Sequence, residues 1–394
     1  MAGRDGSVGP GAGTRAAAPD EAPGAAAAER AALADAALEA GDILFERRGH
    51  LGLVTLNRPK ALNALTHGMA LALDDRLAAW AGDRAVAVVA IRGTGGRAFC
   101  AGGDIRALYE AGRPGGEAGA ANFAFYADEY RLNARIHRFP KPYVALMDGI
   151  VMGGGVGVSI HGSLRVATER TVFAMPETGI GLFPDVGATW FLPRLPGATG
   201  LWLGLTGARL KGHDTVAAGL CDLAMPAHRV DWLVDWLAEG RWETPPEGRA
   251  LDLPGLDPDG PLAAARPSAL AQQDAIDRCF AAGTLEGVID RLEGRGDDWA
   301  EAQLATIRAK SPTCTRLTFR QIRAGATLDF EACMALEYRL ARFCMCHPDF
   351  YEGVRATIID KDGRPGWRPG NLALVDPATV DAAFAPPATG DLQV

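Results

Sequence analysis

The chain has 394 residues, of which 48% are apolar and 22% are charged, and its formal net charge is −8. That length supports a sizeable hydrophobic core and excludes a small scaffold held together by disulfides. The acidic balance also disfavours a polyanion-binding surface, because nucleic-acid-binding domains are usually basic. We therefore expect no nucleic-acid partner.

The first 40 residues are rich in alanine and poor in large aliphatic side chains. Such a composition buries too little apolar surface to offset the entropy of ordering, so 1–40 are predicted to be a disordered tail. The acids in this segment are atypical of a transit peptide. The longest nearly uncharged stretch, 143–159, is interrupted by Asp148 and five glycines, so no membrane span is predicted.

From residue 41 to residue 243 the sequence alternates between strand and helix patterns. Apolar runs predict strands and apolar positions at helical spacing predict helices. The predicted strands are 43–46, 51–56, 85–91, 143–147, 165–167 and 171–175, and the predicted helices are 61–81, one that starts at 105, and 122–137. The order indicates an α/β core built of strand, strand, helix units.

The second half of the chain is predicted to be mostly helical. Helical spacing recurs at 214–219, 229–239, 268–282, 285–292, 299–309, 313–323, 330–346 and 350–359. A connector rich in proline and glycine, 244–267, separates the two regimes and predicts a boundary there. The C-terminal region is therefore expected to span 268–394.

Three segments resemble functional motifs, but the residues around them do not fit the corresponding sites. Gly93 to Ala98 match a loose dinucleotide fingerprint, but no helix follows to receive a pyrophosphate. The segment that contains Ser159 begins like a nucleophile elbow, yet it ends in His161 where the motif needs glycine. Cys344 to His347 lack a second ligand pair, so no metal site is predicted. The seven cysteines show no paired spacing, which predicts a reducing compartment and, in our interpretation, a cytoplasmic location.

Two glycine clusters stand between a buried strand and a helix. They are Ala101-Gly102-Gly103-Asp104 and Met152-Gly153-Gly154-Gly155. Glycine lets a ligand approach bare backbone, and a helix N-terminus leaves N–H donors unpaired. Together the two junctions would offer two donors to one oxygen, as an oxyanion hole does. The glycines alone leave open a second reading, in which they only permit close packing of helix and sheet.

Two carboxylates lie in an apolar loop that follows the second glycine cluster. Glu177 and Asp185 occur in a segment whose prolines and glycines argue against a continuous helix, so a folded loop can bring both acids to one site. Acids in such surroundings are costly unless they are paired, solvated or functional. Glu129, on the helix before 143, is a third candidate, although an exposed position on that helix is the simpler interpretation.

At these residues the sequence resembles the crotonase (enoyl-CoA hydratase/isomerase) superfamily. The resemblance rests on Asn57-Arg58-Pro59-Lys60-Ala61-Leu62-Asn63-Ala64, Phe99-Cys100-Ala101-Gly102-Gly103-Asp104-Ile105 and Gly153-Gly154-Gly155. The run from Met152 to Gly187 is similar to the 3-hydroxyisobutyryl-CoA hydrolase branch, and the likeness extends from about Asp42 to about Val375. The resemblance implies an α/β crotonase-type spiral of ββα units with a mostly helical C-terminal region.

The resemblance also implies roles for the candidate site residues. The backbone N–H groups at Gly103 and Gly154 would polarise a CoA thioester carbonyl, and the branch places its acids at positions that match Glu129, Glu177 and Asp185. Glu177 would attack the carbonyl or activate water, two routes that the sequence leaves open. Asp185 would bind the 3-hydroxyl or assist proton transfer, and Glu129 would support substrate or water.

The implied activity is hydrolysis of a short 3-hydroxyacyl-CoA, with 3-hydroxyisobutyryl-CoA of valine catabolism as the expected substrate. A hydratase of this fold carries a second glutamate at the position of Gly157, and water addition to a double bond needs both an acid and a base. Its absence speaks against hydration. The alternatives are an enoyl-CoA hydratase or isomerase and a non-catalytic acyl-CoA-binding protein.

The remaining expectations concern what surrounds the substrate. Arg58 and Lys60, beside the first helix of the core, are candidate contacts for the CoA phosphates, because local cations must compensate for the acidic chain. No cofactor or metal is expected, since the CoA thioester is the substrate. The resemblance is compatible with a homo-oligomer, and no residue pattern identifies an interface.

Overall fold

The computed structural model describes residues 23–112, 120–240, 269–388 and 390–394, and its strands form two sheets. The six-stranded sheet has the order β1-β2-β3-β5-β7-β10, and the four-stranded sheet has the order β4-β6-β8-β9. The strands are β1 (Ile43–Arg48), β2 (Leu51–Leu56), β3 (Val88–Gly93), β4 (Ala98–Cys100), β5 (Tyr143–Met147), β6 (Ile150–Met152), β7 (Leu164–Ala167), β8 (Val172–Ala174), β9 (Leu210–Lys211) and β10 (Leu223–Ala224).

Successive strand pairs contribute one strand to each sheet. The chain passes from β3 to β4, from β5 to β6 and from β7 to β8, so each turn of the spiral adds a strand to the large sheet and then a strand to the small one. The turns from β3 to β8 pair in parallel in both sheets, whereas β1 pairs with β2, and β8 with β9, in antiparallel fashion. The predicted spiral of strand, strand, helix units is confirmed.

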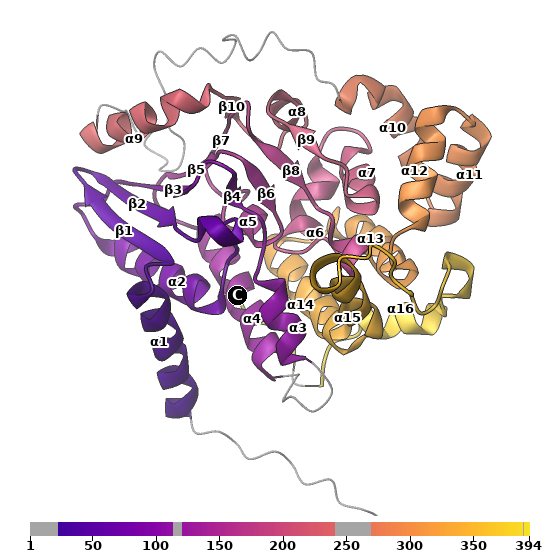
Figure 1. Ribbon diagram of the computed structural model, residues 1–394, viewed down its shortest axis with the longest axis horizontal. Helices are drawn as coiled ribbons and strands as arrows, with labels where there is room; N and C mark the ends of the chain where they lie inside the picture. The colour runs from indigo at the N-terminus through magenta and orange to yellow at the C-terminus, as the bar shows by residue number, and fades with distance from the viewer. Residues whose placement is uncertain (1–22, 113–119, 241–268, 389) are drawn as a thin grey trace, which may run out of the picture.

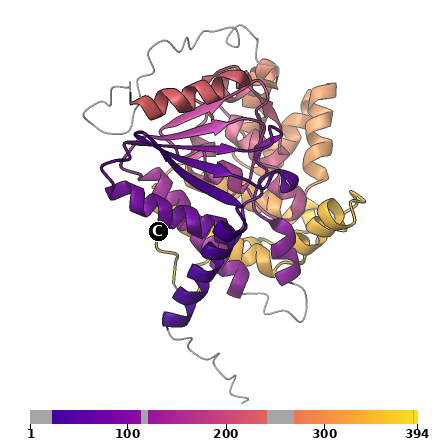
Figure 2. The same ribbon diagram turned by 60° about the vertical axis from the view of Figure 1, so that its left-hand side comes forward.

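Helices cover the strands on both sides. Figure 2 shows the strands of the large sheet side by side, with the rose helix α9 above them and the indigo helices α1 and α2 below. The helices up to this point are α1 (Pro23–Glu39), α2 (His67–Gly82), α3 (Ile105–Ala111), α4 (Ala120–His137), α5 (Gly154–Gly157), α6 (Ala188–Phe191), α7 (Thr199–Thr206), α8 (His213–Ala217) and α9 (Val230–Glu239).

The C-terminal region is helical, as predicted, and packs beside the small sheet (Figure 1, orange to yellow). Its helix α14 packs against α4, and α13 packs against α6 and α7. The helices are α10 (Gln273–Phe280), α11 (Leu285–Arg295), α12 (Asp298–Arg308), α13 (Pro312–Gly325), α14 (Phe330–Cys346), α15 (Pro348–Val354) and α16 (Pro377–Phe384). The predicted connector 244–267 lies outside the described residues, so the boundary between 41–243 and 268–394 stays a prediction.

The prediction of a disordered tail over 1–40 is wrong for its second part. Residues 23–39 form α1, which packs against α2 with Ala34 and Ala37 buried. Alanine is the strongest helix former, and its small side chain lets two helices approach closely. Gly68 on α2 permits that approach, because a Cβ there would lie 2.2 Å from the Leu33 carbonyl oxygen. Residues 1–22 lie outside the described part of the chain.

The first helix of the core starts later than the sequence pattern predicts. Leu62 and Asn63 have positive φ angles of 52° and 56°, so the chain turns before α2 begins. Thr66 then caps α2, because its hydroxyl accepts a hydrogen bond from the Met69 N–H at 3.2 Å. This turn brings Asn63 inside the protein, where its side chain supports the site described below.

Candidate active site

Three loops of the site meet because the strands before them are parallel neighbours. β4 pairs with β6 and β6 pairs with β8, all in parallel. Their carboxyl ends therefore lie at one edge of the small sheet, and the residues that follow them there are Gly102-Gly103, Gly153-Gly154 and Glu177. The sequence predicted the glycine junctions but missed β4 and β6, because these three-residue strands border glycine-rich segments that read as loops.

The two glycine junctions touch each other through bare backbone. A Cβ added to Gly154 would lie 3.3 Å from the backbone nitrogen of Gly103, and one added to Gly153 would lie 3.2 Å from the Cα of Gly102. Gly102 and Gly153 also have φ angles of 123° and 46°, a region that favours glycine. Within the described residues, the N–H groups of Gly103 and Gly154 donate no backbone hydrogen bond. Two unpaired donors therefore lie side by side.

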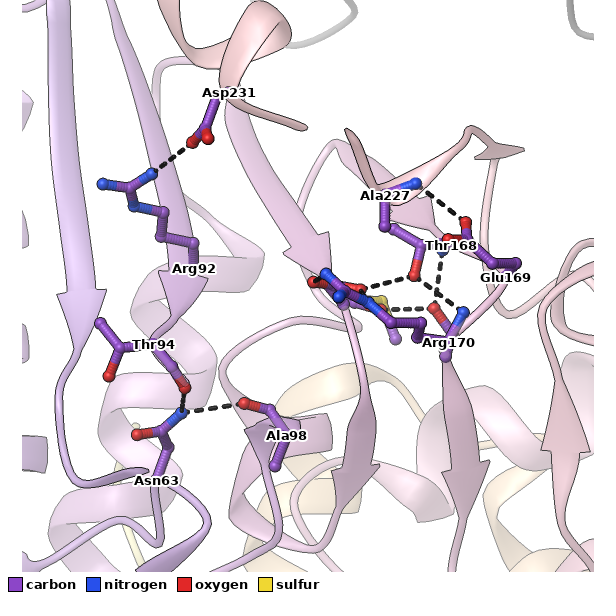
Figure 3. A network of polar contacts seen from close by, with 12 residues as sticks. Asn63, Arg92, Thr94, Ala98, Thr168, Glu169, Arg170, Ala227 and Asp231 are labelled. Atoms are coloured by element: carbon purple, nitrogen blue, oxygen red, sulfur yellow. Dashed lines mark hydrogen bonds and ion pairs between the residues drawn. The ribbon is translucent and has the colours of Figure 1, made fainter. Parts of the chain in front are cut away.

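An asparagine holds the loop that leads into β4 (Figure 3). The side-chain amide of Asn63 donates to the carbonyl oxygens of Thr94 and Ala98, each at 2.9 Å, and its oxygen accepts from the backbone N–H of Arg58 at 2.9 Å. Asn63 is fully buried. It therefore fixes the spacing between the turn before α2 and the strand that ends at the first glycine junction.

A cavity of about 430 Å³ opens in front of these donors. Glu129, Glu177 and Asp185 all line it together with Gly103 and Gly154, so the structure brings these five predicted residues to one place. The three carboxylates are each no more than 5% exposed. The alternative reading of Glu129 as an exposed helix residue is wrong, because α4 turns this face toward the cavity.

Burial changes the ionisation of the three acids. It raises the pKa of Glu177 well above its usual range, and the nearby charge of Asp185 raises it further. Burial likewise raises the pKa of Glu129, with the charges of Asp185 and Glu337 adding to the effect. Burial raises the pKa of Asp185 to about 7, although the hydrogen bond from Tyr130 opposes this. Asp185, whose pKa lies near 7, can therefore exchange a proton near neutral pH.

Some polar atoms of these side chains have no partner within the described residues. They include Glu129 Oε1, Glu177 Oε2 and the hydroxyl of Tyr126. Buried polar groups are nearly always hydrogen-bonded, so unpaired ones that line a cavity indicate groups kept for a ligand. Asp185 is held instead, because the Tyr130 hydroxyl donates to its Oδ2 at 3.0 Å.

Four further residues belong to the site and were not predicted from the sequence. Tyr126 and Tyr130 share a face of α4 with Glu129, a relationship that the helical spacing of 126, 129 and 130 would have revealed. Arg209 and Lys310 line the cavity as its cations. No local pattern singles them out, because they come from segments far apart in the sequence.

The predicted phosphate contacts lie away from the cavity lining. Arg58 donates to the Ala64 carbonyl oxygen at 2.8 Å and pairs with Asp104 at 3.2 Å. Lys60 is exposed. Contact of Arg58 or Lys60 with CoA therefore stays a prediction.

Comparison with known proteins places the chain in a family. The model of the family described as enoyl-CoA hydratase/isomerase matches residues 51–384. The chain belongs to the enoyl-CoA hydratase/isomerase family. The resemblance predicted from the sequence is thus confirmed, and the fold described above is the family's fold.

Curated members of the enoyl-CoA hydratase/isomerase family align with most of the chain. A protein from Danio rerio named 3-hydroxyisobutyryl-CoA hydrolase, mitochondrial, is 47% identical over 87% of this chain and 89% of its own length. The Homo sapiens protein of the same name is 41% identical over 90% of this chain and 91% of its own length.

Solved structures of the family share the fold over the same extent. One described as an enoyl-CoA hydratase from Rhodobacter sphaeroides 2.4.1 is 40% identical, with a TM-score of 0.81, and covers 90% of this chain and 100% of its own. Another, described as a carnitinyl-CoA dehydratase from Mycobacterium thermoresistibile, is 40% identical, with a TM-score of 0.76, over 89% of this chain and 98% of its own.

The names of the curated relatives correct the predicted location. They are mitochondrial proteins, which overturns the cytoplasmic location that we inferred from the cysteines. All cysteines are free, and all but Cys346 are buried. Free thiols argue against an oxidising compartment, but they do not separate the cytoplasm from other reducing ones.

Three further observations concern metal binding, membrane spanning and Ser159. Among the described residues, no group of three or more His, Cys, Asp or Glu side chains is arranged to hold a metal ion. In the same part of the chain every helix is too short or too polar to cross a membrane. The Ser159 hydroxyl is engaged by the backbone, since it donates a hydrogen bond to the Gly155 carbonyl oxygen at 2.7 Å.

Proposed function

We propose that this family member hydrolyses the thioester of 3-hydroxyisobutyryl-CoA and releases 3-hydroxyisobutyrate and CoA. The observation that carries the proposal is the convergence of two unpaired backbone donors, at Gly103 and Gly154, with the carboxyls of Glu177 and Asp185 in one cavity. The names of the curated relatives, at 41–47% identity, support the choice of substrate. The reaction would belong to valine catabolism.

The two N–H groups would receive the carbonyl oxygen of the thioester. Negative charge develops on this oxygen as the carbonyl carbon becomes tetrahedral, and donors fixed in a dry site stabilise it. Removal of a single donor of this kind costs roughly 10²- to 10³-fold in rate. Because both donors are backbone groups, glycine is needed to let the substrate reach them.

Glu177 would form or activate the nucleophile. In one route its carboxylate attacks the carbonyl carbon, the C–S bond breaks, and water then hydrolyses the acyl anhydride. In the other route Glu177 takes a proton from water, which attacks directly. In both routes CoA leaves as a thiol after it gains a proton. With direct attack the water oxygen ends in the new carboxylate, whereas in the anhydride route it ends in the acid whose carbonyl carbon the water attacks.

Asp185 and Glu129 would complete the site. Asp185 would hold the 3-hydroxyl of the acyl group or pass a proton to the leaving thiolate, and a pKa of about 7 suits both tasks near neutral pH. Glu129 Oε1, which lies 2.6 Å from where a Gly154 Cβ would be, would hold substrate or water beside the donors. These groups need no metal or cofactor, a prediction that activity in the presence of a chelator tests.

The absence of a carboxylate at position 157 supports hydrolysis over hydration. Hydratases of this fold carry their second glutamate at the position of Gly157. In this chain a Cβ on Gly157 would lie 2.7 Å from Asn133 Nδ2 and 2.8 Å from the Val186 Cβ. The space that an acid would need is filled. The site therefore lacks the second glutamate at the position from which hydratases of this fold supply it for water addition.

The decisive experiment is a thiol-release assay over a panel of acyl-CoA esters, with crotonyl-CoA absorbance followed in parallel. We expect thiol release from 3-hydroxyisobutyryl-CoA, and a loss of about 10²- to 10⁴-fold in Glu177→Gln and Asp185→Asn. Glu110→Gln, an exposed acid on α3, is the matched control and should retain full activity. Loss of crotonyl absorbance without thiol release would contradict the proposal in favour of hydration, and affinity without turnover would indicate a binding protein.

A further inference from the structure

Two side chains from the C-terminal helices grip the loop that carries Asp185. The carboxylate of Glu337 on α14 accepts hydrogen bonds from the backbone N–H groups of Gly187 and Thr189, each at 2.8 Å. Gln321 on α13 donates through its side-chain amide to the Pro184 carbonyl oxygen and to the Thr189 hydroxyl. Both side chains are fully buried. The loop is thus held at Pro184, directly before its acid, and from Gly187, two residues after it.

The loop needs such support because its backbone is strained. Val186 has a φ angle of 53°, and the following Gly187 has one of 92°. Positive φ is an outlier for a β-branched residue, and such strain persists only where the surroundings over-determine it. The bonds to Glu337 begin at Gly187, directly after the strained residue, so they hold the chain in this conformation.

A buried carboxylate is a costly way to hold a loop. Glu337 receives no ion pair from the described residues, and its bonds come from neutral N–H groups. Burial raises the pKa of Glu337 to about 8, and the charge of Asp185 adds to this effect. The hydrogen bond from the Gly187 N–H acts in the opposite direction. Glu337 does not line the cavity. The free energy spent on burying the Glu337 carboxyl therefore does not serve direct contact with a substrate.

We infer that Glu337, supported by Gln321, is a positioning residue that fixes the Asp185 carboxyl in the cavity, an inference that rests on the proposed function. The helical region beyond residue 268 then contributes to turnover through the backbone of 184–189 rather than by contact with the acyl group. Displacement of a reacting group by about 1 Å can cost on the order of 10²-fold in rate.

The test compares two substitutions at one position. Glu337→Gln keeps the shape and one acceptor, whereas Glu337→Leu removes both. We expect kcat on 3-hydroxyisobutyryl-CoA to fall about 10-fold in the Gln variant and about 10²-fold in the Leu variant, with KM changed less than threefold. Glu331→Gln is the matched control, because Glu331 lies on the same helix and pairs at the surface with Arg138 at 2.8 Å. It should leave both constants unchanged.

A second measurement separates this inference from the proposed function. Amide hydrogen exchange of Gly187 and Thr189 needs no turnover, and it should accelerate in both Glu337 variants while the core strands stay protected. If the unmodified enzyme releases no thiol, the proposed function fails, and exchange still reports whether Glu337 holds the loop. A folded variant with faster exchange and unchanged kcat would overturn the positioning role. If Glu337→Leu does not fold, Glu337→Gln and Gln321→Leu decide by the same two measurements.

Discussion

Gly157 packs directly against Asn133. The contact lies behind the cavity, where α5 meets α4, and a Cβ on Gly157 would come within 2.7 Å of the Asn133 Nδ2. Asn133 is fully buried, and neither its amide nitrogen nor its oxygen has a partner among the described residues. Asn133 on one side and Val186 on the other leave no space for a side chain at position 157, so this position requires glycine.

Gly157→Ala should destabilise the fold and slow turnover together. The added methyl would overpack the contact, which typically costs about 1–3 kcal/mol, and it would press on Val186 beside Asp185. Urea unfolding and the thiol-release assay measure the two effects. Gly294→Ala on α11 is the matched control, since nothing lies within 4 Å of its Cβ position. That variant should be unchanged or gain about 0.5–1 kcal/mol. Equal stability of the two variants would contradict the packing argument.

The stability of the fold should fall as pH rises through the range in which Asp185 ionises. Burial raises the pKa of Asp185 to about 7 in the folded state, whereas an unfolded aspartate ionises near 3.9. Between these values the folded state binds more protons than the unfolded one, so the free energy of unfolding decreases with pH. The groups whose pKa responds to the charge of Asp185 are Tyr126, Glu129, Tyr130, Glu177, Glu337 and Cys344.

Asp185→Asn should weaken that dependence. Asparagine keeps an oxygen for the Tyr130 hydroxyl and removes the ionisable group, so its free energy of unfolding should fall less between about pH 4 and about pH 7. Urea unfolding at both ends of this range gives the comparison. Parallel declines in the two proteins would show that Asp185 does not titrate in the folded state as described.

Lys310→Met should shift the pH profile of activity upward. The charge of Lys310 lowers the pKa of Glu177, while burial and Asp185 raise it. Loss of the cation should therefore raise the pKa of Glu177 further, and the acid limb of the kcat/KM profile should move to higher pH. Lys211→Met, an exposed lysine on β9, should leave the profile in place. An unmoved limb in Lys310→Met would show that Glu177 does not control it.

Lys60→Ala should make the KM for the CoA ester less sensitive to salt. Salt screens the attraction between an exposed cation and a phosphate, so loss of that contact removes part of the dependence. KM measured between low and high ionic strength gives the slope, with Lys211→Ala as the control. An unchanged slope in Lys60→Ala would remove this residue from the substrate contacts.

Much of the core followed from local patterns. Apolar runs and helical spacing predicted most of the larger strands and helices, and the glycine clusters and acids identified five residues that line the cavity. The α1 helix was missed because the composition of 1–40 does not show that α2 packs against this segment and buries Ala34 and Ala37. The three-residue strands β4 and β6 were missed because they border glycine-rich segments that read as loops.

The sequence by itself determined the residue types at the site, because unpaired donors at strand–helix junctions require glycine and the chemistry requires acids nearby. Only the tertiary structure decided that the donors at Gly103 and Gly154 meet, since this depends on β4 and β6 pairing in parallel. It also decided that helices far along the chain hold the Asp185 loop. Such contacts join residues well over 100 positions apart, and no local pattern encodes a distance of that kind.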